Sequence, residues 1–250
     1  ANPIKENYPD SFGIENHMSN RALRAMELFG KDQSITAEEF ERYKFDMRYS
    51  VDSYMSLFVD RLISLSDGFD DNQLQEGVNI LKSWDRNTDL DNKNATLPII
   101  SFGWFMETLP TDVSDENLIE SFTYAVKYLY NHYGKLDVIW GKVNRLVRGS
   151  LNLAVAGGPD ISRAIYGIPT DGGYLKGYAG DAFHMLVEWG IDGAVNSRSI
   201  HQYGSNTQHE TSSHYSDQSK LFVERKLKPV WLKLQTIKEN LEQAYSPGNK

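Results

Sequence analysis

The chain has 250 residues, enough for one large domain or two small ones, and its 40% hydrophobic and 24% charged residues are typical of a globular protein. The formal net charge of -8 argues against a nucleic-acid-binding surface, because such surfaces need clustered Lys and Arg. The absence of cysteine excludes disulfides, thiolate metal ligands and a Cys nucleophile, and no apolar run approaches the ~20 residues of a membrane span.

The first half of the chain predicts helices. Residues 1–13 are expected to form an extended lead-in, followed by a short amphipathic helix over residues 20–29 that Gly30 ends. Thr36, with Glu39 three residues later, has the form of a capping box. The helix that it opens carries Phe40, Tyr43 and Met47 at helical spacing.

Three further helices are expected before residue 135. The first has one apolar side, made of Tyr54, Leu57, Phe58, Leu62 and Ile63. Asp70 or Asp71 can cap the next, which holds Leu74, Val78 and Leu81. Ser114 can cap a helix over about residues 115–133, which Gly134 ends.

From about Leu136 the pattern changes to short runs separated by Gly-Gly, Pro-Asp and Asp-Gly turn signals. Strands are expected at residues 151–156, 162–166, 182–189 and 194–201. Pro229 is expected to open a last helix containing Val230, Leu232, Leu234, Ile237 and Leu241. Helices followed by strands indicate the α+β class. We therefore expect one unit over residues 1–250, mainly helical over 1–135, with strands and a terminal helix over 136–250.

Two patterns resemble metal sites. Asp85, Asn87, Asp89 and Asp91 alternate like the start of a calcium loop, but the loop glycine and the terminal glutamate are missing. An Asx-rich turn is the better interpretation. His209, Glu210 and His214 differ from a zinc helix motif because the histidines are five residues apart, not four. We therefore assign no metal site and no cofactor.

Other residue types point to no catalytic group. The glycines between Gly157 and Gly180 fit turns, since neither a phosphate loop nor a dinucleotide fingerprint is present. The 5 Trp and 14 Tyr could line a sugar-binding surface, but most sit at core periodicities.

Four stretches carry more specific patterns. Residues 20–39 place an Arg-bearing helix before Ile-Thr-Ala-Glu, and residues 81–97 end a helix in Trp84 and Asp85 before an Asp/Asn-rich turn. Residues 140–158 read Trp-Gly-x-x-x-Arg, an apolar strand and Gly-Gly. The segment from Tyr203 to Phe222 holds Tyr-Gly, Ser-x-His-Tyr and Asp-Gln, at Tyr203, Gly204, Ser212, His214, Tyr215, Asp217 and Gln218.

In their order and spacing, these stretches resemble the penicillin acylase (penicillin amidase) family of N-terminal nucleophile hydrolases. The resemblance is nearer to acylases for long aliphatic chains and to cephalosporin acylases than to penicillin G acylase. It implies part of a four-layer α-β-β-α fold and a precursor that cuts itself into two chains. It also implies an N-terminal serine nucleophile on the larger (β) chain, whose α-amine acts as the base. In such enzymes, backbone N–H groups and an asparagine side chain stabilise the oxyanion.

Residue 1 is Ala, so this sequence departs from that pattern at the nucleophile. We expect a chain cut from a longer protein, namely the C-terminal portion of the β chain, inactive alone. The expected partners are the small α chain, the N-terminal part of the β chain and a small acyl amide substrate of the penicillin, cephalosporin, acyl-homoserine-lactone or lipopeptide type. The resemblance places the parent in the periplasm of a bacterium, or outside it. The alternative is a non-catalytic binding module, for carbohydrate or another ligand, that shares the fold.

The resemblance also suggests roles for single residues. Arg21 matches an arginine that orients the catalytic network, with Arg24 as the neighbouring candidate and a surface charge as the plain alternative. Asp10 falls near an acid that binds metal in some members, and calcium is conceivable in the full-length protein, but we assign neither here. Structural roles are expected for Trp84, Asp85, His214, Tyr215, Asp217 and Gln218.

Overall fold

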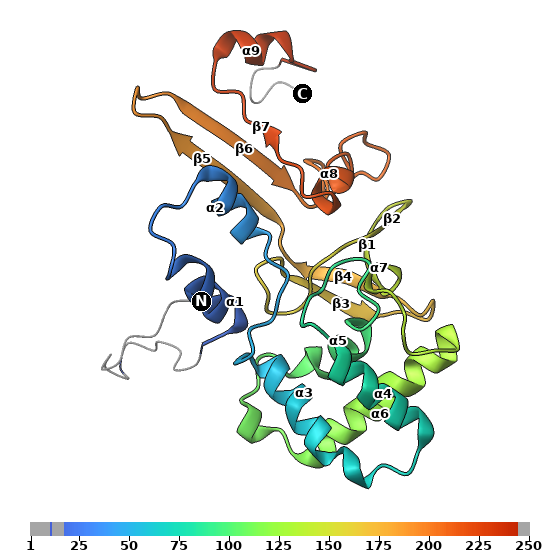
Figure 1. Cartoon of the computed structure of the whole chain (residues 1–250). Coiled ribbons are helices and arrows are strands. Elements are labelled where there is room, and N and C mark those ends of the chain that lie inside the picture. The colour runs from blue at the N-terminus through green and yellow to red at the C-terminus, as the bar shows by residue number, and fades with distance from the viewer. Residues whose placement is uncertain (1–10, 12–17, 245–250) are drawn as a thin grey trace.

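The computed structural model describes Ser11 and residues 18–244. Helices occupy the first half and strands dominate the second, which confirms the α+β class (Figure 1). The helices before the first strand are α1 (Asn20–Phe29), α2 (Ala37–Lys44), α3 (Tyr54–Leu65), α4 (Asn72–Ser83), α5 (Thr96–Phe102), α6 (Asp115–Tyr133) and the single turn α7 (Trp140–Val143). Short 3-10 turns lie at Ser66–Gly68, Gly103–Phe105 and Pro110–Asp112. Among the described residues, no helix is long and apolar enough to cross a membrane.

The predicted helix ends are confirmed where they depend on capping chemistry. Thr36 and Glu39 form the reciprocal capping box at the start of α2. Asp71 and Ser114 accept hydrogen bonds from the first-turn N–H groups of α4 and α6. Gly134 ends α6 with φ 68°, in the left-handed region that glycine adopts without strain.

The larger core lies among α3, α4, α5 and α6, at the lower end of Figure 1. Helix α5 is buried along its whole length, and Phe58, Leu62 and Phe122 are fully buried beside it. Gly77 of α4 allows close packing, because a Cβ there would lie 2.7 Å from the ring of Phe122. Burial of these apolar side chains is the main term that stabilises this part of the fold.

The strands form two sheets. The first has the order β2-β1-β4-β3, in which β1 and β4 are parallel and the other pairs are antiparallel. The second has the antiparallel order β5-β6-β7. The strand bounds are β1 (Asn144–Arg148), β2 (Leu151–Ala154), β3 (Ile165–Pro169), β4 (Leu175–Gly180), β5 (Phe183–Trp189), β6 (Val195–His201) and β7 (Lys228–Pro229). Two short helices follow β6 in the chain, α8 (Ser219–Val223) before β7 and α9 (Leu234–Glu239) after it.

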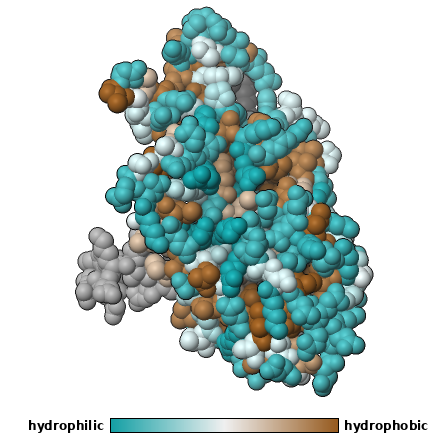
Figure 2. Space-filling view, viewed as in Figure 1, coloured by the Kyte–Doolittle hydropathy of each residue, from teal (hydrophilic) through white to brown (hydrophobic). Residues whose placement is uncertain are grey.

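The hairpin of β5 and β6 projects away from the helical core (Figure 1). Leu186, Val187 and Arg198 line a groove between this hairpin and helices α1 and α2. Phe183, Met185 and Trp189 alternate along β5, and their exposed fractions are 57%, 47% and 72%. Ile191, in the turn of this hairpin, is fully exposed, and Figure 2 shows an isolated brown group at the tip. The outer edge of β5 pairs with no strand in the described part of the chain.

The prediction of a helix opened by Pro229 is wrong. Lys228 and Pro229 form β7, which pairs with Ser199 and Arg198 at the edge of the second sheet, and Val230 N–H donates to Ser197 O. Proline is tolerated there because an edge strand leaves one side of the ladder unpaired. The last helix is the short, exposed α9.

Other boundaries also differ from the sequence prediction. The strand expected at residues 162–166 begins at Ile165 and runs to Pro169. Helix α2 ends at Lys44, so Met47 lies beyond it. Strands β1 and β4 and helices α5, α7 and α8 were not predicted.

Candidate functional site

The start of α1 is bound to a turn far along the chain, at residues 157–160. Asn20 N–H donates to Asp160 Oδ2 (2.7 Å), and the Asn20 side-chain amide donates to the backbone oxygens of Asp160 (3.0 Å) and Arg48 (3.1 Å). Asn20 Oδ1 in turn accepts from Ser50 N–H (2.7 Å). Asn20 and Asp160 are 2% and 5% exposed, so this network fixes the first turn of α1 from inside the protein.

Arg21 follows Asn20 on the same turn. Its Nε donates to Asp160 Oδ1 at 3.3 Å, while its side chain remains 47% exposed. Among the described residues, no group accepts a hydrogen bond from its two terminal nitrogens. The guanidinium is therefore held at one end and presents its outer donors to the surroundings.

Arg24, the neighbouring candidate, is fully engaged instead. Its Nε and Nη2 donate to the two carboxylate oxygens of Asp46, each at 2.9 Å, and it also pairs with Glu27. The Arg24 side chain is 15% exposed, and hydrogen bonding to Asp46 raises its pKa above the usual arginine value. This bidentate pair joins α1 to the segment after α2.

Asp160 has an unusual backbone for an L-residue, with φ 54°, a conformation that Asp tolerates better than most residues. Tyr49 and Tyr166 support the turn, because Tyr49 OH donates to Pro159 O (2.6 Å) and Tyr166 OH accepts from Asp160 N–H (3.2 Å). Burial raises the pKa of the Asp160 carboxyl, and the hydrogen bonds from Asn20 and Arg21 oppose that shift.

Trp84 and Asp85 lie at the end of α4. Trp84 is 5% exposed, packs edge-on against Tyr49 and donates from Nε1 to Asn87 O (3.0 Å). Asp85 Oδ1 accepts from Asn87 N–H (3.0 Å) and from the side chain of Asn92 (2.8 Å). The carboxylate thus closes an Asx turn, as expected.

The polar segment over residues 203–222 joins β6 to α8 and folds back on itself. Gly204 lies against the backbone of His214, where a Cβ would be 2.1 Å from the His214 oxygen. Gln218 N–H donates to Tyr203 O (2.8 Å), and Gln218 Oε1 accepts from His201 N–H (3.0 Å). The segment is therefore closed at both ends by hydrogen bonds to β6 and its flank.

Two side chains of this segment contact other elements. The Arg148 guanidinium of β1 stacks 3.7 Å above the ring of Tyr215. His214 lies between Asp217 (Nδ1 to Oδ2, 2.9 Å) and Glu242 (Nε2 to Oε2, 2.6 Å), and hydrogen bonding to Asp217 and then Glu242 raises its pKa.

The structure brings only some of the predicted site residues together. Arg21 pairs with Asp160, and Trp84 packs against Tyr49, whose hydroxyl donates to Pro159 O of the same turn. His214 lies elsewhere, near α8, with Asp217 and Glu242. Among the described residues, no group of three or more His, Asp or Glu is arranged to hold a metal ion. Asp10 lies outside the described residues.

A model of the family described as penicillin amidase matches residues 1–239. The chain belongs to the penicillin amidase family. The match includes all four stretches that carried the resemblance, and both Arg21 and Asp160.

Among solved structures, the penicillin amidase chain is similar to the thermostable penicillin G acylase from Alcaligenes faecalis. The sequences are 12% identical, the TM-score is 0.47, and the match covers 98% of this chain and 55% of the acylase chain. The chain therefore spans about half the length of that acylase. No curated protein matches it.

Sequence reasoning missed Asn20 and Asp160, the two buried residues that position Arg21 in this penicillin amidase chain. The Pro-Asp pair at 159–160 predicts a turn, and the structure has one there, but the pair does not indicate that Asp160 accepts hydrogen bonds from α1. One further signal existed: Asp is one of the few residues that tolerate a positive φ, so Asp160 can both form the turn and supply an acceptor.

Proposed function

We propose that the chain forms part of an acylase, in which an N-terminal serine of the same precursor hydrolyses an acyl amide. Membership of the penicillin amidase family supports this proposal. The proposed context is a four-layer α-β-β-α fold in a periplasmic or secreted bacterial protein. On this view the nucleophile, its neighbouring histidine and the oxyanion asparagine belong to the part of the protein that precedes this chain.

The hydrogen bonding of Arg21 is the observation that supports this proposal most directly. A guanidinium anchored through Nε to a buried carboxylate, with its terminal nitrogens unengaged by described residues, can donate to an asparagine carbonyl or to a substrate. Arg24 cannot do so without giving up its bidentate pair with Asp46. We therefore assign the orienting role to Arg21.

The rest of the precursor is the proposed partner of the β5 face. Phe183, Met185 and Trp189 form an apolar row on an edge strand. A surface of this kind is normally covered by another segment of protein. This proposal gives structural roles to Trp84, Asp85 and the 203–222 segment. Their contacts hold loops to neighbouring strands and helices.

The proposal is tested on protein made from the complete reading frame, by intact mass and N-terminal sequencing. We expect two chains, of which the larger begins with serine and contains this sequence. A screen of acyl amides that differ in chain length then defines the substrate. A single uncut chain, or a large chain that begins with another residue type, would reject the serine mechanism and favour the binding module.

A further inference from the structure

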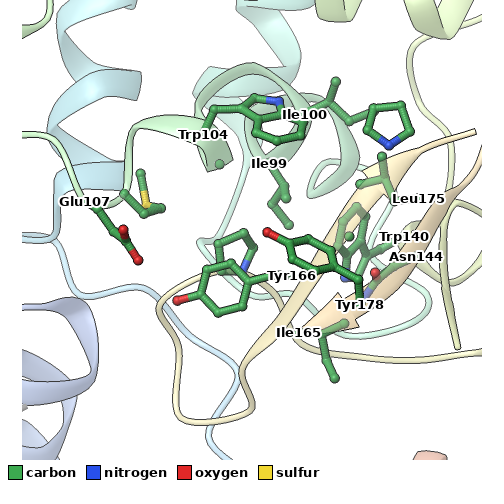
Figure 3. Close-up of a pocket in the computed structure, with 15 residues that line it drawn as sticks. Ile99, Ile100, Trp104, Glu107, Trp140, Asn144, Ile165, Tyr166, Leu175 and Tyr178 are labelled. Atoms are coloured by element: carbon green, nitrogen blue, oxygen red, sulfur yellow. The ribbon is translucent and has the colours of Figure 1, made fainter. Parts of the chain in front are cut away.

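Two pockets of this chain differ in their chemistry. Figure 3 shows the one between α5 and the first sheet, whose lining is mainly apolar and includes Ile99, Ile165 and Leu175. The other, which we call the arginine pocket, lies at the end of α2 and has a cavity volume of about 380 Å³. Charged and amide side chains make up most of its lining, namely Glu41, Arg42, Asp46, Arg48, Asn87 and Arg225.

Both acidic groups of the arginine pocket are already paired. Asp46 accepts two hydrogen bonds from Arg24, each of 2.9 Å. Glu41 forms an ion pair with Arg198 across 2.8 Å. Arginines of α1 and β6 therefore balance the two carboxylates, and the arginines of the pocket itself make its local charge positive.

Arg48 and Asn87 lie opposite each other in this lining. The two residues form an isolated antiparallel bridge. Backbone hydrogen bonds of 2.9 and 3.0 Å between the flanking residues enclose the pair. Residues that are directly opposite in such a bridge place their side chains on the same face, close together. A guanidinium and an amide thus extend from one fixed piece of backbone.

The hydrogen-bond donors of this pair are uncommitted. Asn87 Oδ1 accepts from Asp89 N–H (3.0 Å), which fixes the amide and leaves Nδ2 as the group that can donate. Among the described residues, neither Asn87 Nδ2 nor the Arg48 guanidinium donates to an acceptor. Arg48 is exposed and Asn87 is half-buried, so a molecule in the pocket can reach both side chains.

Arg225 reaches the same pocket from the turn after α8. Its backbone has φ 59°, and its Nη1 lies 3.5 Å from Sδ of Met47, the neighbour of Arg48 in the chain. A thioether sulfur is a weak acceptor, so an anionic oxygen would be a much stronger partner for this guanidinium. The pocket therefore holds exposed donors without anionic partners, beside acids that are already neutralised.

We propose that the arginine pocket binds a small ligand with a doubly charged oxyanion, of the phosphate-monoester class. Arg48 and Arg225 supply two positive charges and Asn87 a neutral donor, which together match a dianion that accepts several hydrogen bonds. An engineered cavity of about 150 Å³ holds one benzene molecule, so a pocket of about 380 Å³ has space for a small organic group beside the phosphate. The proposal does not depend on hydrolysis of an acyl amide.

The first experiment measures Kd by ³¹P NMR on protein made from the complete reading frame, with inorganic phosphate and methyl phosphate as probes. The titrations are made at constant ionic strength and at about pH 8, where a phosphate monoester is dianionic. We expect saturable binding of both probes. Signals that broaden without saturation would show loose association of ions with the surface and would overturn the proposal.

Competition with the bound phosphate then tests the class of anion. Acetate carries one charge and should compete about tenfold more weakly than phosphate, because one charged donor stays unpaired. Succinate carries two carboxylates and should also be the weaker competitor. Tighter binding of succinate would assign the pocket to dicarboxylates and overturn the phosphate class.

The second experiment locates the anion with variants at exposed positions, where folding should be retained. Arg48→Gln and Arg225→Gln each remove one charged donor, so each should raise Kd about tenfold. Lys127→Gln removes an exposed cation of α6 that does not line the pocket, and it should leave Kd unchanged. Binding that does not respond to the two arginine variants would place the anion elsewhere and overturn the proposal.

Asn87→Asp is the sharpest variant because the two side chains have nearly the same shape. It keeps an oxygen to accept from Asp89 N–H and replaces the free donor with a like charge, so Kd should rise at least about tenfold. The exposed Asn117→Asp adds the same charge on α6 and should have no effect. Equal weakening by the two variants would show an effect of net charge alone and would overturn the role of Asn87.

The fate of this proposal can be distinguished from that of the acylase. An unprocessed, inactive precursor that binds phosphate with the expected variant pattern would reject the acylase proposal and leave the arginine pocket standing. An active acylase that binds neither phosphate probe would reject the arginine pocket alone.

Discussion

The Arg21 guanidinium lies 3.3 Å from the Asp160 carboxylate, although 139 positions separate the two residues in the chain. The same carboxylate accepts from Asn20 N–H, so one buried acid determines both the start of α1 and the position of its arginine. Helix α1 is thus held by a turn that follows the whole helical region in the sequence. The orientation of Arg21 is a property of the tertiary fold, and no local feature of α1 specifies it.

Replacement of Asp160 by Ala should release the start of α1. The variant loses the acceptor for Asn20 and Arg21 and places a less tolerant residue at φ 54°. We expect a loss of about 1–3 kcal/mol in the free energy of unfolding, the cost of unpaired buried partners. Urea unfolding measures it, with the exposed Asp52→Ala as the control. An unchanged midpoint for Asp160→Ala would contradict the anchoring role.

Substitution of Arg21 should mainly reduce activity, whereas substitution of Arg24 should mainly reduce stability. If Arg21 has the proposed orienting role, Arg21→Ala in the processed protein should lower kcat about 100-fold. Its cost in stability should be smaller than that of Arg24→Ala, because Asp160 keeps its hydrogen bond from Asn20 N–H. Arg24→Ala leaves the partly buried Asp46 unpaired and should mainly reduce stability, by up to about 3 kcal/mol. Parallel activity and unfolding assays test this, and the reverse pattern would assign the catalytic role to Arg24.

Gly204 should be intolerant of any side chain. In Gly204→Ala the Cβ would lie 2.1 Å from the backbone oxygen of His214, so the 203–222 segment must open. We expect a loss of about 1–3 kcal/mol in thermal or urea unfolding. Gly68→Ala is the matched control, since nothing lies within 4 Å of a Cβ there. Equal stability of the two variants would show that the segment is not held as the structure describes.

His184 should make the protein less stable in acid. Burial, with Lys44 as the next contribution, lowers its pKa from 6.5 to about 4. The unfolded chain gains a proton as the pH falls through 6.5, whereas folded His184 stays neutral until about 4, so stability is lost as pH falls across that window. His184→Phe should flatten unfolding free energy against pH, and the exposed His209→Gln should not. A slope unchanged in His184→Phe would assign the effect to other groups.

The sequence could predict features that depend on neighbouring residues. Caps at Thr36, Asp71, Ser114 and Gly134 were found because capping is a matter of three or four residues. The segment at Pro229 was mistaken for a helix because its apolar periodicity is real, but pairing with β6 outweighs it. Arg21 is a candidate from its place before Ile-Thr-Ala-Glu, and its role stays a prediction. Its pairing with Asp160 could not be predicted, because only the fold brings the two residues together.

The larger core has a consequence for the order of events during synthesis. Its buried residues run from Tyr49 to Val143, apart from Ile161 and Leu175. The smaller core draws on Leu146, Val155, Ile165, Ile200 and Phe222. As the chain emerges from the ribosome, nearly the whole interior of the helical region is therefore outside before the first strand has emerged. We expect the sheets to assemble on a surface that is already in place, with pairing of distant strands as the later and slower step.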